Sequence, residues 1–240
     1  MIIDFSSMSP LRILRKSSQK GLGRGNLGVL MARAGVGKTA CLIHIAFDKL
    51  FRREKLLHVS LVDVPEKVTS YYNVIYSDLV KALNLEAEHE TRALMERNRM
   101  ILAYLNQSFE IERLRRNMNN LKEHIGFQPD HLIVDGLDFA LTDRAVLEGF
   151  KEVAVDFNAE VWFSAVSHRH LPGRNERGIP QPLSEIDDVF QIILQLMPDA
   201  TGIHLNLLKD HDTYGDPVAS IRIDPGTFLA VSKTEASSTL

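Results

Sequence analysis

The chain has 240 residues, of which 45% are hydrophobic and 25% are charged, and its formal net charge is −3. This composition is typical of a globular protein, so it excludes a mainly disordered chain and a uniformly basic nucleic-acid coat. The single cysteine, Cys41, excludes an internal disulfide and favours a reducing compartment. No apolar run reaches the ~18–20 residues that cross a bilayer, and residues 1–10 lack a signal-peptide pattern. We therefore expect a cytoplasmic protein with no membrane partner.

Short, continuously apolar runs alternate with helical periodicity through the first two thirds of the chain. Runs without polar alternation are typical of strands that are buried on both faces, as in parallel sheets. A stripe of apolar residues three or four positions apart predicts a helix. Strands are predicted over residues 27–31, 56–62, 101–105, 131–135 and 161–167, and helices over residues 39–51, 109–124 and 146–157, the last after a cap at Thr142. This alternation predicts an α/β fold with a mostly parallel twisted sheet flanked by helices.

After Ser184 the pattern changes to strands joined by turns. The predicted strands are residues 190–197, 203–209, 218–223 and 227–231, with no helical pattern between them. Such a series predicts hairpins that extend the sheet at one edge as an antiparallel β extension. We therefore expect one domain over residues 1–231 and a flexible polar tail over residues 232–240.

Residues 32–39 (A-R-A-G-V-G-K-T) lie between a predicted strand and a predicted helix, which is the setting of a phosphate-binding loop. The two glycines let backbone N–H groups turn toward an anion, and the helix adds the positive end of its dipole. Lys38 supplies charge to the β and γ phosphates, and the hydroxyl of Thr39 is a ligand for Mg²⁺. The first residue is alanine where the strict pattern has glycine, and a glycine-rich turn without a ligand is the alternative. The residues expected to contact the nucleotide are Ala34, Gly35, Val36, Gly37, Lys38, Thr39 and Ala40.

The loop lies in a stretch of one charge sign, because residues 5–47 contain seven basic residues and no acidic residue before Asp48. Such a stretch favours an anionic ligand. For the segment from Arg12 to Lys20, a solvated basic face is an equally good interpretation.

The strand predicted over His131–Asp135 ends in a carboxylate. In phosphoryl-transfer sites with a phosphate loop, an aspartate at a neighbouring strand end holds Mg²⁺ directly or through water. Asp135 is therefore the second expected metal ligand, together with Thr39. Asp138 either supports the metal site from behind or caps the segment that follows.

In the order of these parts, the chain resembles the RecA-like ATPases, and in particular the DnaB and KaiC type of core, from Leu27 to about Val231. The phosphate loop and the strand ending at Asp135 are the specific motifs of this resemblance, and the other parts agree in order and spacing. The resemblance implies that the chain binds ATP and Mg²⁺. It also implies a homo-oligomer, because members of this family assemble into rings or filaments with nucleotide at the subunit boundary.

Two departures from the family pattern concern hydrolysis. The family has a catalytic glutamate where this chain has Val62, and Asp63 beside it is the available replacement, although its side chain should face the other way. The family also has a lysine and an arginine, two residues apart, that reach a neighbour's γ phosphate. Here Lys209 and His211 occupy those positions, and a neutral imidazole is a poor substitute for a guanidinium. We therefore expect slow hydrolysis.

The strand predicted over residues 161–167 would lie beside the acidic strand, and its end would carry a polar residue that senses the γ phosphate. Ser167 is the preferred candidate and His168 is the other, while both residues could equally well just end the strand. The loop that follows, residues 169–184, lies where RecA-like motors contact nucleic acid, but acidic residues close by favour a solvated, mobile loop.

The sequence thus predicts an Mg-ATP-binding, RecA-like P-loop protein with slow or regulatory ATP hydrolysis, which acts as a nucleotide-dependent switch or oligomer. One alternative is a DNA-associated ATPase motor or loader, although the net charge does not favour a nucleic-acid partner. The other is an interaction scaffold that does not hydrolyse ATP.

Overall fold

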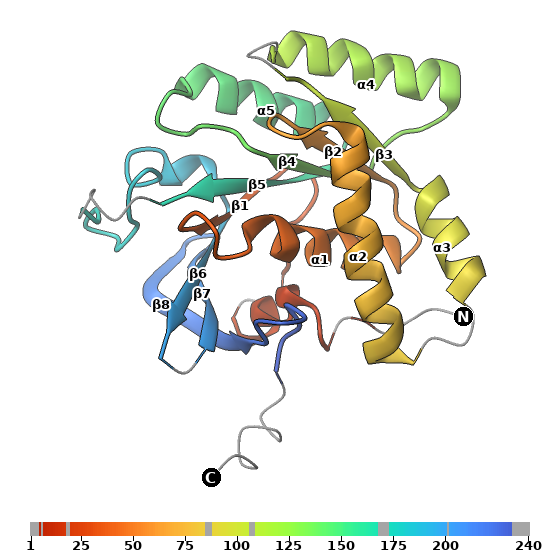
Figure 1. Ribbon diagram of the computed structural model, residues 1–240. Coiled ribbons are helices and arrows are strands. Elements are labelled where there is room, and N and C mark those ends of the chain that lie inside the picture. The colour runs from red at the N-terminus through yellow and green to blue at the C-terminus, as the bar shows by residue number, and fades with distance from the viewer. Residues whose placement is uncertain are drawn as a thin grey trace.

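A computed structural model describes residues 5, 7–17, 20–84, 88–105, 109–167, 173–200 and 202–231 (Figure 1). Its eight strands form one sheet in the order β3-β2-β4-β5-β1-β6-β7-β8. The strands are β1 (Leu27–Ala32), β2 (Leu56–Ser60), β3 (Arg99–Ala103), β4 (His131–Asp135), β5 (Glu160–Val166), β6 (Ile192–Asp199), β7 (Gly202–Asp210) and β8 (Thr213–Ile223). Neighbouring strands from β3 through β6 are parallel, and β7 and β8 are antiparallel. The predicted α/β class with a mostly parallel sheet is confirmed.

Helices cover both faces of the sheet (Figure 1). The helices are α1 (Lys38–Leu50), α2 (Pro65–Leu83), α3 (Glu88–Arg97), α4 (Ile111–Ile125) and α5 (Arg144–Asp156), with short 3₁₀ helices η1 (Pro10–Lys16) and η2 (Asp187–Val189). The side chains of α1, α2 and η1 form one core cluster with one face of the sheet, and those of α4 and α5 form a second cluster with the other face. The central strand β1 is therefore buried at every position, which explains its continuously apolar sequence.

Two predictions about the C-terminal strands are wrong. β6 is parallel to β1 and not antiparallel, because the chain from β5 crosses back along the sheet before β6 begins. A parallel neighbour requires such a crossover, and the short helix η2 lies in the described part of this crossover. The predicted strand over residues 227–231 is a turn with one isolated bridge at Ala230. The helix α3 was not predicted. Met95 is its buried residue, and a single buried apolar residue does not form the apolar stripe from which a helix is predicted.

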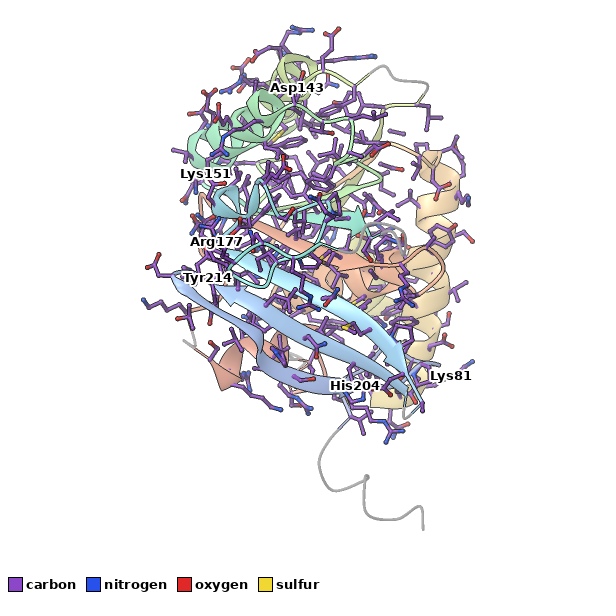
Figure 2. The ribbon with its side chains drawn as sticks, turned by 90° about the vertical axis from the view of Figure 1, so that its left-hand side faces the viewer. Lys81, Asp143, Lys151, Arg177, His204 and Tyr214 are labelled. Carbon is purple, nitrogen blue, oxygen red and sulfur yellow. The ribbon has the colours of Figure 1, made fainter. Side chains whose placement is uncertain are left out.

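The predicted mobile loop is ordered in its described part. Ile179 and Leu183 are fully buried against the sheet. The Asn175 side chain donates to the carbonyl of Ser184 and to the carboxylate of Asp187. The guanidinium of Arg177 donates to the same carboxylate at 2.7 Å and lies over the ring of Tyr214 (Figure 2). Residues 168–172, which include His168, and the predicted tail over residues 232–240 lie outside the described residues.

None of the helices in the described part of the chain combines the length and the apolarity that a bilayer crossing requires.

Candidate functional site

The phosphate loop connects the end of β1 to the start of α1. Both glycines of the loop have left-handed backbone conformations, with φ of 77° at Gly35 and 99° at Gly37. The conformation at Gly37 is one that side chains rarely adopt, so glycine is required there. Ala32, at the position where the strict motif has glycine, is the last residue of β1 and is fully buried between β5 and β6. Because its backbone is an ordinary strand, alanine is compatible with this position.

Thr39 and Asp135 meet at the carboxyl edge of the sheet, as the sequence analysis expected. The hydroxyl of Thr39, in the first turn of α1, donates to Oδ2 of Asp135 at 2.8 Å. Asp135 is the last residue of β4. Two ligands in adjacent positions of an octahedral Mg²⁺ site, each ~2.0–2.1 Å from the ion, are ~2.9 Å apart. A hydroxyl and a carboxylate oxygen at this separation therefore fit a magnesium site.

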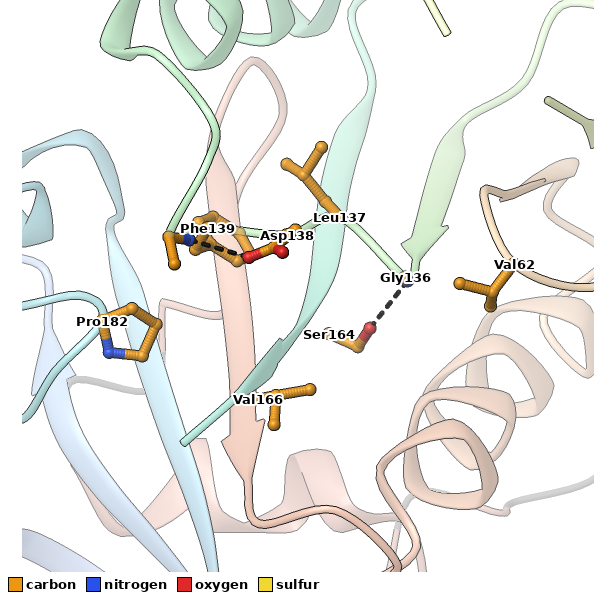
Figure 3. A pocket seen from close by; sticks show the side chains of 9 residues that line it. Val62, Gly136, Leu137, Asp138, Phe139, Ser164, Val166 and Pro182 are labelled. Carbon is orange, nitrogen blue, oxygen red and sulfur yellow. Dashed lines mark hydrogen bonds between the residues drawn. The ribbon is translucent and has the colours of Figure 1, made fainter. Parts of the chain in front are cut away.

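Ser164, in the middle of β5, fixes the other oxygen of this carboxylate. Its hydroxyl donates to Oδ1 of Asp135 at 2.5 Å. The same hydroxyl accepts from the backbone N–H of Gly136 at 3.1 Å (Figure 3). Ser164 is 4% exposed, so both bonds are shielded from water. With Oδ1 held in this way, Oδ2 is directed at Thr39. The sequence analysis missed Ser164, although a lone serine inside an apolar strand next to the acidic strand was the available signal.

Lys38, the first residue of α1, directs its side chain back to the loop. Its ammonium group donates to the carbonyl of Arg33 at 3.3 Å. Partial burial lowers the pKa of Lys38, and the negative charge of Asp135 opposes that change. The lysine is thus held over the loop, next to the position where a bound anion would lie.

A cavity of ≈ 630 Å³ opens beside the loop, between α1 and α2. One side consists of the phosphate loop and Ile43 of α1, and the opposite side consists of Ser70, Tyr71, Val74 and Ile75 of α2. A polar, cationic end and an apolar, partly aromatic wall are the two surfaces that a nucleotide needs for its phosphates and its base.

A second cavity of ≈ 270 Å³ lies at the carboxyl ends of β4 and β5 (Figure 3). Val62, Asp138, Ser164 and Val166 are among its lining residues. Val62 packs on Gly136, where an added Cβ would lie 2.7 Å from a methyl carbon of Val62. The valine thus occupies the rim at which the resemblance would place a catalytic carboxylate. Asp138 caps the following turn by accepting from the backbone N–H of Ala140.

Asp63, the expected replacement for the missing glutamate, is held by another group. Its carboxylate accepts from the ammonium of Lys67 at 2.6 Å, and its backbone N–H donates to the hydroxyl of Ser60. Asp63 is not among the residues that line the cavity beside Val62. Ser167 follows β5, and its backbone N–H donates to the carbonyl of Ala32 at the start of the loop. This contact places the backbone of Ser167 next to the start of the phosphate loop, and its role as a sensor of the γ phosphate stays a prediction.

Lys209 and His211 lie far from the phosphate loop of their own chain. The end of β7 pairs with the start of β6, and the start of β6 pairs with the start of β1. The phosphate loop lies at the opposite end of β1. Lys209 is buried, donates to the carbonyl of Asp187 at 2.8 Å and lies over the ring of Tyr214. The expectation that Lys209 reaches a neighbouring subunit is not supported by this position, because the ammonium group is already bonded inside its own chain. His211 is partly exposed and its Nδ1 lies 2.8 Å from Oδ1 of Asp210.

The basic residues near the N-terminus hold other parts of the chain together. Arg12 donates to the carbonyl of Val231, Lys16 to that of Ser220, and Arg24 pairs with Asp130. These three residues therefore bond to other parts of the chain, and the prediction that the basic stretch attracts an anionic ligand does not apply to them. Only Arg33 and Lys38 of the basic set belong to the phosphate loop.

No protein-family model matches this chain, and a search of curated proteins finds no significant match.

Proposed function

We propose that this chain is a RecA-like P-loop protein that binds ATP with Mg²⁺ and hydrolyses it slowly, so that the bound nucleotide acts as a switch. The observation that carries the proposal is the 2.8 Å contact between Thr39 and Asp135, which joins the phosphate-loop helix to the acidic strand. A strand, a glycine-containing loop and a helix in this order, combined with a carboxylate on a neighbouring strand, are the parts that a Mg-nucleotide site requires.

Each part has a role in binding. The backbone N–H groups of the loop and the ammonium of Lys38 bind the phosphates, while Thr39 and Asp135 would hold the metal. Bound Mg²⁺ neutralises charge on the β and γ phosphates. Ser164 keeps the carboxylate of Asp135 in the orientation that faces Thr39. The cavity between α1 and α2 receives the nucleoside, with Tyr71 on its wall.

The surroundings of the metal site favour slow hydrolysis. Val62 is 59% exposed at the rim of the cavity at the ends of β4 and β5 and has no group that can accept a proton from water. The carboxylate of Asp63 is paired with Lys67 and does not line that cavity. A general base has to lie within hydrogen-bond reach of the attacking water. A protein that binds ATP tightly and turns it over slowly can signal through its nucleotide state.

The first test is Mg-ATP binding to the wild-type chain and to Lys38→Ala, measured by calorimetry. We expect binding by the wild type and none by the variant, because the variant lacks the phosphate charge. Lys122→Ala, at an exposed position of α4, is the matched control and should bind normally. A folded Lys38→Ala variant with unchanged ATP affinity would refute the proposal.

The second test restores a carboxylate at the rim of the cavity with Val62→Glu. If Val62 limits a hydrolytic site, turnover of Mg-ATP should rise well above the slow wild-type rate. The specific alternative favoured by Val62 is an interaction scaffold in which nucleotide only stabilises the fold. Unchanged, negligible turnover in Val62→Glu with intact ATP binding would favour that scaffold.

A DNA-associated motor or loader is less well supported. Arg177, one of the loop arginines available for phosphate contacts, is paired with the fully buried Asp187. Salt-sensitive binding to single-stranded DNA would support the hypothesis of a DNA-associated motor or loader.

A further inference from the structure

The chain after β8 makes a tight turn at residues 224–228 that packs against the phosphate-loop helix. Oδ1 of Asp224 accepts hydrogen bonds from the backbone N–H groups of Gly226 and Thr227 and from the hydroxyl of Thr227. The backbone N–H of Phe228 donates to the carbonyl of Asp224 at 2.8 Å. These four bonds fix the turn independently of any contact with the nucleotide site.

The ring of Phe228 is pressed against Gly37 of the phosphate loop. A Cβ added to Gly37 would lie 2.0 Å from Cζ and 2.4 Å from Cε1 of this ring. The glycine is therefore required twice, by its left-handed backbone and by the ring that touches it. No residue larger than glycine fits between the loop and Phe228.

Phe228 itself adopts an unfavourable backbone conformation, with φ of 56°. A bulky residue in the left-handed region is an outlier that persists only where its surroundings hold it. The surroundings here are the four bonds of the turn and the two buried residues that follow, Leu229 and Ala230. Ala230 also donates to the carbonyl of Met8, which ties the segment to the N-terminal part of the chain.

A second contact joins the turn to the same helix. His44, about two turns beyond Gly37, is 2% exposed; burial lowers its pKa to about 4, and its interaction with the backbone of Thr227 opposes that change. Phe228 and Thr227 thus contact the first half of α1 at Gly37 and His44. The phosphate loop and the C-terminal turn are thereby parts of one packed unit.

The ring supports the loop without filling the nucleotide cavity. Gly37 and Lys38 line the cavity between α1 and α2, whereas Phe228 is not among its lining residues. The ring therefore contacts Gly37 from outside the cavity. A group in this position restrains the loop and leaves the space for the phosphates open.

We propose that Phe228 is a positioning residue that holds the phosphate loop in its anion-binding shape, so that the C-terminal turn and the nucleotide site are energetically coupled. The coupling rests on the proposed nucleotide binding, and the support of the loop by the ring does not. Since coupling between two sites is reciprocal, a nucleotide in the loop should also stabilise the turn.

The support of the loop is tested without nucleotide, by amide hydrogen exchange in the wild type and in Phe228→Ala. Removal of the ring should speed exchange in residues 33–39 and leave strand β5, Glu160–Val166, unchanged. Phe228→Leu, which keeps an apolar side chain of similar reach, should restore much of the protection and remains informative if the alanine variant does not fold. Leu141→Ala, at an exposed apolar position, is the control. Loop exchange that is the same in the wild type, in Phe228→Ala and in Phe228→Leu would overturn the proposal.

The coupling is tested by Mg-ATP affinity of the same variants. If the freed loop adopts the binding shape about one tenth of the time, the apparent affinity falls about tenfold. Asp224→Asn, which weakens the turn but keeps the ring, should give a smaller loss. Faster loop exchange together with unchanged ATP affinity would overturn the coupling. If the wild type binds no ATP, the proposed function fails, while the exchange experiment still decides whether Phe228 supports the loop.

Discussion

Replacement of Ser164 by alanine tests whether the carboxylate of Asp135 is held as the structure indicates. The substitution removes a hydrogen bond to a charged group in a place that is 4% exposed. It also leaves the backbone N–H of Gly136 without its acceptor. A hydrogen bond to a charged group contributes about 1.5–3 kcal/mol, and an unsatisfied polar group adds to the loss. We expect the free energy of unfolding to fall by about 2–3 kcal/mol, within those limits.

The assay is equilibrium unfolding in urea, with the dependence on urea concentration compared between variants. An unchanged slope would show that the substitution alters stability and not the compactness of either state. In a thermal scan the same loss corresponds to a decrease of about 4–12 °C for a chain of this size. Ser77→Ala, at an exposed position of α2, is the control and should change the free energy by less than about 0.5 kcal/mol.

The functional part of this prediction concerns Mg²⁺. Without Ser164 the carboxylate of Asp135 is free to turn away from Thr39, so Mg-ATP should stabilise Ser164→Ala less than it stabilises the wild type. A Ser164→Ala variant within about 0.5 kcal/mol of the wild type, a change typical of surface substitutions, would refute the reasoning.

Three further predictions concern the rest of the fold. Glu160→Gln should destabilise the protein by about 3 kcal/mol, because it leaves Lys49 buried without its partner. Burial alone would raise the pKa of Glu160, but the hydrogen bond with His131 and the charge of Lys49 outweigh it and hold the pKa at about 2. Since the ordinary value is 4.5, this stabilisation is complete above pH 4.5 and is lost as the pH falls toward 2. If the free energies of unfolding of the wild type and of Glu160→Gln differ equally at both ends of this range, the assignment is contradicted. Gly37→Ala should destabilise the wild type more than it destabilises Phe228→Ala, because the added Cβ then meets no ring; additive effects in a double-mutant cycle would argue against the contact. Cys41 is fully buried, and burial raises the pKa of its thiol to about 12. A thiol reagent should therefore label it only as the protein unfolds. Rapid labelling of the native protein would show that α1 is not packed as described.

Much of the fold could be predicted from local sequence. Continuously apolar runs identified the parallel strands, and the stripe of α4 identified a helix. These predictions succeed because a strand that is buried on both faces has a continuous apolar sequence, and a helix that is buried on one face has apolar residues every three or four positions. The orientation of β6 has no corresponding pattern in the sequence. It depends on where the chain crosses the sheet before Ile192, and no local pattern encodes the direction of that crossing.

The candidate site likewise has parts that could be predicted from the sequence and parts that could not. The sequence by itself identified the glycine-containing loop of residues 32–39 and the carboxylate at the end of β4 as the candidate site, because each requires a particular residue type at a fixed distance from a strand end. Only the tertiary structure decided that Ser164 holds that carboxylate, that Lys209 is buried within its own chain, and that Phe228 rests on Gly37. These contacts join residues far apart in the sequence, and they follow from the order in which the strands pair and from the path of the chain between them. Residue spacing along the chain encodes what a segment can do, whereas packing decides which distant side chains meet it.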